Sequence, residues 1–319
     1  MESALGLTTR RWKNAPKGLY SVNLHRVGDP SQSMLDSNVF SCSEEQLEEH
    51  LRFFKSNFTV VNQDDLVTLF KQPEKVKQDR YLAITFDDGY IDNYSLALPM
   101  LKRHGLSATF FIATGLVGNQ VLPWWDKVAY LLKSSGASSI KIAGWESTIE
   151  SKGNQQLFVR MVLKQFKSCP LSADEQIRQM EEKLNFTAQY PTPEFMTWDN
   201  VKTLHESGMD IGAHSHNHFI LTKLTDEEIL FELQHSKALL EDHLKIPIKA
   251  FSYPIGNQST YNQSVIETLK STGYEFAFNF LPGININLED KRYDLHRFPI
   301  ETNMNKTNLM QMLAYAQVY

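Results

Sequence analysis

The sequence predicts an α/β protein built on a parallel β-sheet. Short apolar runs of strand length alternate with amphipathic helices along most of the chain, which is typical of successive βα units. Polar residues capable of chemistry follow directly after several of these runs, and the carboxyl ends of parallel strands are where active sites form. A chain of 319 residues with 42% hydrophobic residues can bury an ordinary core, in one large domain or two.

The first part of the chain contains a regular series of predicted strands and helices. The predicted strands lie at residues 19–28, 58–61, 81–86 and 107–114. Ser43 and Gln46 have capping-box spacing at the start of one intervening helix, and Gly105 can end another. These signals set the boundaries of the helices that separate the strands.

The alternation is then interrupted by a polar, helix-compatible stretch. We predict a mostly helical insertion at about residues 136–196, closed by Pro191 and Pro193. The sequence allows two interpretations of it, a border of the substrate groove or surface filler. Residues 1–18 are predicted to be an N-terminal extension, and residues 19–319 a single domain that carries the insertion.

The βα alternation resumes after the insertion. The predicted strands lie at residues 209–213, 249–254, 274–280 and 296–300. Thr197 can cap the first helix of this part, which Gly208 closes. Thr225 and Glu228 form the capping box of a strongly amphipathic helix that follows.

Charge and cysteine content exclude several classes of protein. The formal net charge is −5 and no block of Lys and Arg occurs, so a nucleic-acid partner is not expected. Cys42 and Cys169 are the two cysteines, and they give no disulfide framework. No run is apolar enough for a signal peptide or a transmembrane helix, which predicts a cytoplasmic protein, although a secreted chain without its leader would look the same.

Two adjacent carboxylates, Asp87 and Asp88, follow the predicted strand at 81–86 and precede Gly89. Side chains of neighbouring residues leave a strand on opposite sides, so both can face one pocket only if the chain turns sharply, which Gly89 permits. The alternative interpretation is a solvated Asp-Gly turn. Taken alone, this stretch favours the turn.

Three histidines in five residues, His214, His216 and His218, change that balance. Neutral imidazole is the commonest nitrogen ligand of zinc. His214 and His218 can come to one face where a strand passes into a helix, and an extended chain would instead pair His214 with His216. Two imidazoles and one carboxylate form an open coordination set, with the second carboxylate free to act as general base on a bound water.

These residues resemble the motifs of the polysaccharide deacetylases of carbohydrate esterase family 4. "TFDDG" at 85–89 is similar to the first motif of that family, and "HSHNH" at 214–218 to its second. The resemblance implies a distorted (β/α) barrel that binds one divalent metal ion, most often Zn²⁺. It implies Asp88, His214 and His218 as ligands and Asp87 as general base, and leaves His216 as a supporting residue of the ligands.

The walls of the pocket carry a weaker resemblance. "FSYPIG" at 251–256 is similar to the third motif, which implies that Tyr253 offers its N–H to the oxyanion and its ring to the groove. Ser252 stands where many members have an arginine. Trp124 and Trp125 resemble an aromatic wall for a sugar ring, and the alternative is two core tryptophans.

The final motif of the family, Leu-x-His, is replaced here by Leu295-His296-Arg297. Members similar to the bacterial poly-N-acetylglucosamine deacetylases carry the histidine strand at the N-terminal end instead, and "SVNLHRVG" resembles it. This implies His25 as the general acid, with His296 as the fallback, and Arg297 beside Asp87.

Together these features predict a metal-dependent hydrolase that removes N-acetyl groups from a sugar of a polysaccharide or glycan precursor. Two alternatives remain open. The same site can serve a non-carbohydrate N-acyl or imide substrate, or the chain can be a non-catalytic glycan-binding relative. The sequence gives neither the glycan linkage nor the oligomeric state.

Overall fold

The structure, a computed structural model, describes residues 10–119, 121–302 and 304–319. The chain divides into two compact units. The first contains the described residues up to Gly28, residues 41–119 and the chain from Glu194 onward, and the second contains residues 29–40 and 121–193. The second unit therefore begins earlier than the predicted insertion at 136–196, and it includes a short segment from near the N-terminus.

The first unit contains an eight-stranded sheet in which every paired strand is parallel. Its order is β11-β10-β9-β6-β5-β1-β12, with β4 also paired to β5. The strands are β1 (Gly18–Leu24), β4 (Thr59–Val60), β5 (Arg80–Phe86), β6 (Thr109–Ile112), β9 (Asp210–Ala213), β10 (Ala250–Ser252), β11 (Phe276–Phe278) and β12 (Phe298–Pro299). The predicted parallel α/β fold is confirmed.

One segment connects the two edges of this sheet. Leu295 forms a parallel bridge to Phe278 of β11, and Phe298 three residues later pairs with Val22 of β1. The chain therefore crosses from the last strand of the sheet to the strand beside the opposite edge. This connection curls the sheet toward a barrel and places Arg297 at the closure.

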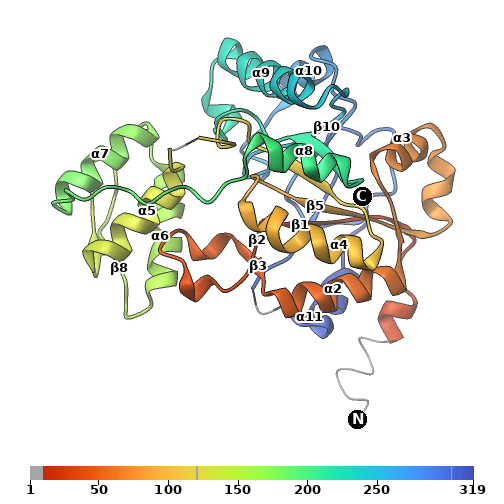
Figure 1. The fold of residues 1–319 in the computed structure, drawn as a ribbon, viewed down its shortest axis with the longest axis horizontal. Coiled ribbons are helices and arrows are strands. Elements are labelled where there is room, and N and C mark those ends of the chain that lie inside the picture. Colours follow the sequence, from red (N-terminus) through yellow and green to blue (C-terminus); the bar gives the residue numbers. More distant parts are fainter. Residues whose placement is uncertain (1–9, 120, 303) are drawn as a thin grey trace. The chain divides into compact units, whose positions relative to one another are not determined.

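Helices of the first unit surround this sheet (Figure 1). They are α2 (Glu44–Asn57), α3 (Gln63–Lys71), α4 (Leu98–His104), α8 (Trp198–Glu206), α9 (Asp226–Leu244), α10 (Gln263–Ser271) and α11 (Lys306–Ala314). The predicted capping boxes at Ser43 and Thr225 are both present, and Gly105 ends α4 in the left-handed conformation. Local sequence signals thus set the helix boundaries as expected.

Short elements complete the first unit. A two-stranded sheet pairs β2 (Arg26–Val27) with β3 (Phe40–Cys42). Trp12 lies in the region predicted as an N-terminal extension, yet it is buried and packs against Tyr20, Phe53 and Phe58. This part of the extension therefore belongs to the core of the unit.

The second unit is mostly helical. It contains α5 (Trp124–Ser135), α6 (Gln155–Ser168), α7 (Ala173–Lys183) and the hairpin of β7 (Ser139–Ile140) with β8 (Ile149–Glu150). Lys133 of α5 donates hydrogen bonds to the carbonyl oxygens of Ser33 and Leu35, at 3.0 and 2.6 Å. These bonds attach the early segment, 29–40, to the helices of the unit.

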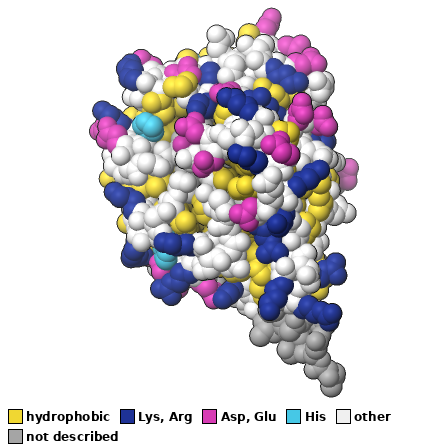
Figure 2. All heavy atoms as spheres, turned by 90° about the vertical axis from the view of Figure 1, so that its right-hand side faces the viewer, with side chains coloured by type: hydrophobic (Ala, Val, Ile, Leu, Met, Phe, Trp, Pro, Cys, Tyr) yellow, Lys and Arg dark blue, Asp and Glu magenta, His cyan; other side chains and the backbone are white. Residues whose placement is uncertain are grey.

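The surface carries both signs of charge. Figure 2 shows basic and acidic side chains interspersed over one face, with small apolar areas between them. Such a mixed surface differs from the basic stripe of a nucleic-acid-binding protein. In the part of the chain that the structure describes, no helix combines the length and hydrophobicity needed to span a bilayer.

The close packing of β6 on β9 can be tested at Gly212. A Cβ atom at this position would lie 2.5 Å from two ring carbons of Phe111 and 3.0 Å from the carbonyl oxygen of Ala250. We expect Gly212→Ala to lower the free energy of unfolding by about 1–3 kcal/mol in urea denaturation, because overpacking forces the strands apart. Gly105→Ala, which meets no neighbour but retains a positive φ, should cost only about 1 kcal/mol. Equal stability of Gly212→Ala and the wild type would contradict this packing.

Candidate active site

Most of the chemically capable side chains predicted from the sequence lie at the carboxyl ends of strands of the parallel sheet. Asp87 and Asp88 follow β5, and His214 follows β9. Ser252 ends β10. Arg297 instead precedes β12, and its side chain reaches Asp87 from the segment that follows the Leu295 bridge to β11. Parallel strands direct these residues to one edge of the sheet, where the active sites of such folds form.

Asp88, His214 and His218 form a compact cluster. The Oδ1 atom of Asp88 lies 3.4 Å from Nε2 of His214 and 3.3 Å from Nε2 of His218. All three residues are buried, and their ligand atoms lie within 4.8 Å of one another. The structure therefore brings together the three residues predicted as metal ligands.

The hydrogen bond of His214 fixes its tautomer. Its Nδ1 lies 2.7 Å from the carbonyl oxygen of Ser252, and a carbonyl oxygen only accepts, so Nδ1 carries the proton. The lone pair of Nε2 then faces Asp88. This arrangement is typical of a zinc-binding histidine, whose other nitrogen donates to a carbonyl or carboxylate.

The residues of this cluster fit a divalent ion. Two ligand atoms that each lie about 2.1 Å from a tetrahedral ion are roughly 3.4 Å apart, close to the two separations between Oδ1 of Asp88 and the histidine nitrogens. Within the described residues, Oδ1 of Asp88 is a buried atom that receives no hydrogen bond of standard geometry. An oxygen in this state is stabilised by a cation. Two imidazoles and a carboxylate suit Zn²⁺.

The loop that carries the histidines is sharply turned rather than helical. Ser215 and His218 both have left-handed backbone conformations, with φ of 60° and 56°. Asp88 also has a positive φ, 76°. Such conformations are costly for residues other than glycine and concentrate at functional sites. They allow the first and fifth residues of the loop to face the same carboxylate.

Asp87 lies beside the cluster and binds Arg297. Its two carboxylate oxygens accept hydrogen bonds from Nη1 and Nη2 of Arg297 at 2.8 and 2.9 Å. Ser252 and Asn23 each donate a further hydrogen bond to Oδ2 at 3.1 Å. Asp87 thus takes a different role from its neighbour, because its charge is balanced by a guanidinium.

Arg297 is fully buried, and all five of its N–H groups are bonded. Besides Asp87, it donates to the carbonyl oxygen of Asn279, to Oγ1 of Thr85 and to Oγ of Ser252. The small Ser252 therefore occupies the position where the family arginine was expected, and Arg297 reaches Asp87 from the closure segment. The predicted placement of Arg297 is observed.

The electrostatics keep both carboxylates ionised. Burial alone raises the pKa of Asp87, but Arg297 and then His214 outweigh it and lower that pKa below its ordinary value. Burial likewise raises the pKa of Asp88, and the neighbouring imidazoles of His214 and His218 hold it well below the ordinary value. Asp87 is therefore available as a proton acceptor at neutral pH.

His25 lies between β1 and β2 and is half-buried. The carbonyl oxygen of Leu24, the residue before it, accepts the N–H of Asp87 at 2.9 Å, so the backbone at His25 lies beside the two aspartates. The N–H of His25 donates to Oγ of Ser41 at 2.9 Å, and its carbonyl oxygen accepts from Asn93 at 2.6 Å. The backbone at His25 is thus held from both sides.

The two roles predicted for Tyr253 are not supported. Its N–H donates to the carbonyl oxygen of Phe278 at 3.1 Å as part of the pairing of β10 with β11. Its ring is buried against Tyr261, and its hydroxyl donates to the carbonyl oxygen of Tyr293 at 2.8 Å. Ile255, two residues further on, has an unusual φ of 63° for a β-branched residue.

The other two histidine candidates face elsewhere. Nδ1 of His216 is hydrogen-bonded to Oγ1 of Thr114 at 2.9 Å, and its ring contacts His235. The cluster of potential ligand atoms contains His218 and not His216, so the structure does not form the alternative pair of His214 with His216. The ring of His296 stacks on Tyr319 with centroids 3.9 Å apart, so the fallback acid packs against the C-terminal residue.

Trp124 and Trp125 belong to the second unit. The ring of Trp124 stacks on Phe166 with centroids 4.9 Å apart, and Trp125 is buried. These contacts hold both rings within their own unit. Their predicted role as a wall of the groove stays a prediction.

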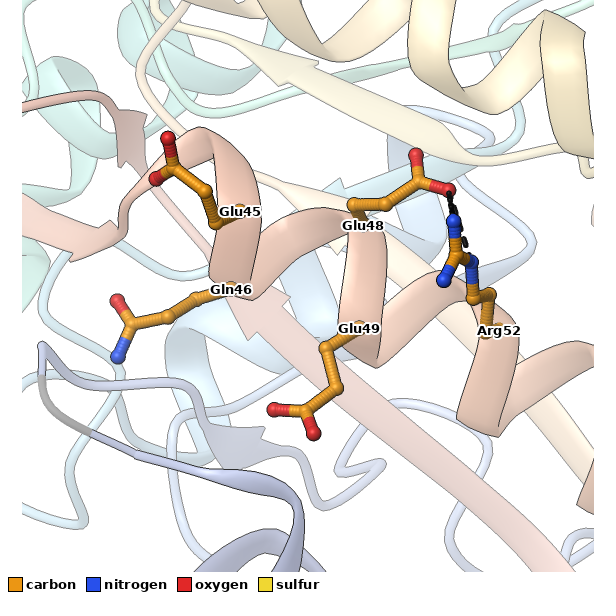
Figure 3. A pocket seen from close by; sticks show the side chains of 5 residues that line it. All are labelled: Glu45, Gln46, Glu48, Glu49 and Arg52. Carbon is orange, nitrogen blue, oxygen red and sulfur yellow. Dashed lines mark hydrogen bonds and ion pairs between the residues drawn. The ribbon is translucent and has the colours of Figure 1, made fainter.

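A shallow pocket on α2 is separate from this site (Figure 3). It is lined by Glu45, Gln46, Glu48, Glu49 and Arg52. Glu48 pairs with Arg52 at 2.9 Å and also with Arg103. This pocket is a charged helix surface whose central carboxylate is already neutralised.

Comparisons with known proteins agree with this geometry. The sequence profile of the polysaccharide deacetylase family matches residues 74–277. YxkH of Bacillus subtilis (strain 168), which carries a provisional polysaccharide deacetylase assignment, is 20% identical over 273 residues, covering 86% of this chain and 70% of YxkH.

Solved structures share the fold at low sequence identity. The deacetylase PplD of Streptococcus pyogenes, in complex with acetate, matches with a TM-score of 0.62 and 17% identity, covering 93% of this chain and 99% of PplD. IcaB from Ammonifex degensii matches with a TM-score of 0.60 and 16% identity, covering 94% of this chain and 97% of IcaB.

The profile covers more than half of the chain, so the protein belongs to the polysaccharide deacetylase family. The predicted family, the hydrolase class and the distorted (β/α) barrel are confirmed.

The buried pair of Asp87 and Arg297 makes a direct prediction about stability. Arg297→Met should lower the free energy of unfolding by about 3–5 kcal/mol, because it leaves the carboxylate buried without a counter-charge. Adding Asp87→Asn should restore at least about 1 kcal/mol in a double-mutant cycle followed by urea denaturation. Arg52→Met, which breaks an exposed pair, is the control and should change stability by about 0.5 kcal/mol or less. Additive losses for the two buried positions would contradict the pairing.

Proposed function

We propose that this protein removes acetyl groups from N-acetylated sugars of a polysaccharide or glycan precursor, with Zn²⁺ as its metal ion. The observation that carries the proposal is the separation of two adjacent carboxylates into different partnerships. Asp88 faces two imidazoles, and Asp87 is held by Arg297. Metal-assisted hydrolysis of an amide uses a residue that binds the metal and a residue that accepts a proton, and this arrangement supplies one of each.

Asp88, His214 and His218 would hold the ion. When bound, Zn²⁺ supplies Lewis acidity that polarises the acetyl carbonyl and lowers the pKa of a water molecule. The lone pairs on the facing nitrogens of the histidines suit this role, because the proton of His214 lies on its other nitrogen.

Asp87 acts as the general base that accepts a proton from the attacking water. Its Oδ1 accepts one hydrogen bond, from Arg297, among the residues that the structure describes, so a lone pair remains for the substrate water. Arg297 and Ser252 orient the carboxylate. A positioned base of this kind contributes typically 10²–10⁴-fold to the rate.

His25 donates a proton to the departing amine nitrogen of the sugar. An amine is a poor leaving group unless it is protonated, so the reaction needs an acid as well as a base. His25 is half-buried, directly follows the residue that accepts the N–H of Asp87, and has a backbone held by Ser41 and Asn93.

Acetate release from a panel of substrates tests the proposal. We expect release from N-acetylated oligosaccharides and little from small acylated amides or cyclic imides. Activity on the small amides alone would favour a non-carbohydrate amidohydrolase. Binding of the oligosaccharides without release would favour a non-catalytic binding protein.

The unequal roles of the aspartates can be separated by zinc content and turnover. Asp87→Asn should retain zinc, measured by mass spectrometry of the dialysed protein, and should lose roughly 10²–10⁴-fold in the rate of acetate release. Asp88→Asn should lose both zinc and activity. Turnover near the wild-type rate in Asp87→Asn would contradict the assignment of the base.

The role of His25 depends on the leaving group. His25→Ala should lower acetate release from an N-acetylated sugar by roughly 10²–10⁴-fold. It should leave hydrolysis of 4-nitrophenyl acetate nearly unchanged, because 4-nitrophenolate departs without a proton. His296→Ala is the matched control and should retain activity on both substrates. Equal losses on both substrates would show that His25 is not the acid.

A further inference from the structure

We infer that Glu232 of α9 is a positioning residue for the metal-binding loop. Its buried carboxylate fixes the peptide units of His216 and Asn217, and these units set the orientation of the two histidine ligands on either side. This inference rests on the proposed metal site at Asp88, His214 and His218.

Glu232 contacts the middle of the metal-binding loop, at His216 and Asn217. Its Oε2 accepts the N–H groups of His216 and Asn217, both at 2.8 Å. Its Oε1 accepts the side-chain amide of Asn217 at 2.7 Å. The residue is only 2% exposed. All three donors therefore lie between the two predicted ligands.

The conformation of the loop explains why such an anchor is needed. Ser215 and His218 are both left-handed, with φ of 60° and 56°, and strained residues persist only when their surroundings fix them. Hydrogen bonds between neutral groups also hold the loop, among them those from the N–H of His218 to Oγ of Ser215 at 3.1 Å and from the N–H of Gly115 to the carbonyl oxygen of His216 at 2.8 Å. Glu232 adds charge-assisted bonds, which are stronger than neutral ones.

The helix itself does not require a carboxylate at this position. Glu232 lies on the buried face of α9 next to Leu233 and near Ile229, both of which pack in the core. A buried carboxylate is costly unless hydrogen bonds stabilise it. Among the described residues, the hydrogen bonds of the Glu232 carboxylate all go to the loop, so these contacts explain a glutamate at this position of the helix.

The experiment compares zinc affinity in variants of the full-length protein. The Kd for Zn²⁺ is measured by competition with a chromophoric chelator, and the visible spectrum of the Co²⁺-loaded protein reports ligand geometry. Glu232→Ala should weaken Zn²⁺ binding by about 10–100-fold, the usual effect of removing a group that orients a ligand, and should alter the Co²⁺ spectrum.

Glu232→Gln is the conservative variant. Its amide oxygen can accept the same two backbone N–H groups, and its NH₂ group can pair with Asn217 once the amide of Asn217 rotates. Zn²⁺ affinity should therefore stay within roughly a factor of three of the wild type. Asn217→Asp in the Glu232→Gln background should also retain affinity, because a carboxylate and an amide still face each other.

Leu233→Ala is the matched control for general loss of stability. This neighbouring residue is fully buried in the core, so the variant should lower Tm by about 5–10 °C and leave the Kd for Zn²⁺ of the folded protein unchanged. Unchanged Zn²⁺ affinity and an unchanged Co²⁺ spectrum in Glu232→Ala, beside a wild type that binds Zn²⁺ tightly, would overturn the role of Glu232 alone. Absence of Zn²⁺ binding by the wild type would overturn the metal site itself.

Discussion

The site depends on how two adjacent buried carboxylates are neutralised. Asp87 and Asp88 are 2% and 3% exposed, and two like charges so close together are stable only if each has its own positive partner. Arg297 provides a guanidinium for Asp87. Asp88 faces the imidazoles of His214 and His218, and a cation bound by these three residues would balance its charge. This division of partners gives neighbouring, chemically identical residues different functions.

The closure of the sheet supplies the first of these partners. Arg297 lies between Leu295, which bridges to β11, and Phe298, which pairs with β1. The segment that joins the two edges of the sheet is therefore also the segment that holds the proposed base. Asn23 on β1 and Ser252 on β10 complete the hydrogen bonds to Asp87. Correct curling of the sheet and correct orientation of the base depend on the same contacts.

Part of the site could be predicted from the sequence, because residue type and position in the chain were sufficient to identify it. The strand ends at Asp87 and His214 follow from local patterns, and Arg297 follows from the family resemblance. The oxyanion role predicted for Tyr253 was wrong because residue spacing does not reveal that its backbone N–H is already used in strand pairing. Glu232 was missed because a glutamate within an amphipathic helix is ordinarily assigned to the solvent face. The inclusion of residues 29–40 in the second unit was missed because it depends on contacts between segments distant in sequence.

The most direct measurement is anomalous X-ray scattering at the zinc edge from crystals grown with Zn²⁺. We expect one strong peak at about 2.0–2.2 Å from Oδ1 of Asp88 and from Nε2 of His214 and His218. Asp87 should remain paired with Arg297 and outside the coordination sphere. A peak coordinated by Asp87, or a peak at His216 with none at Asp88, would contradict the division of roles between the two aspartates.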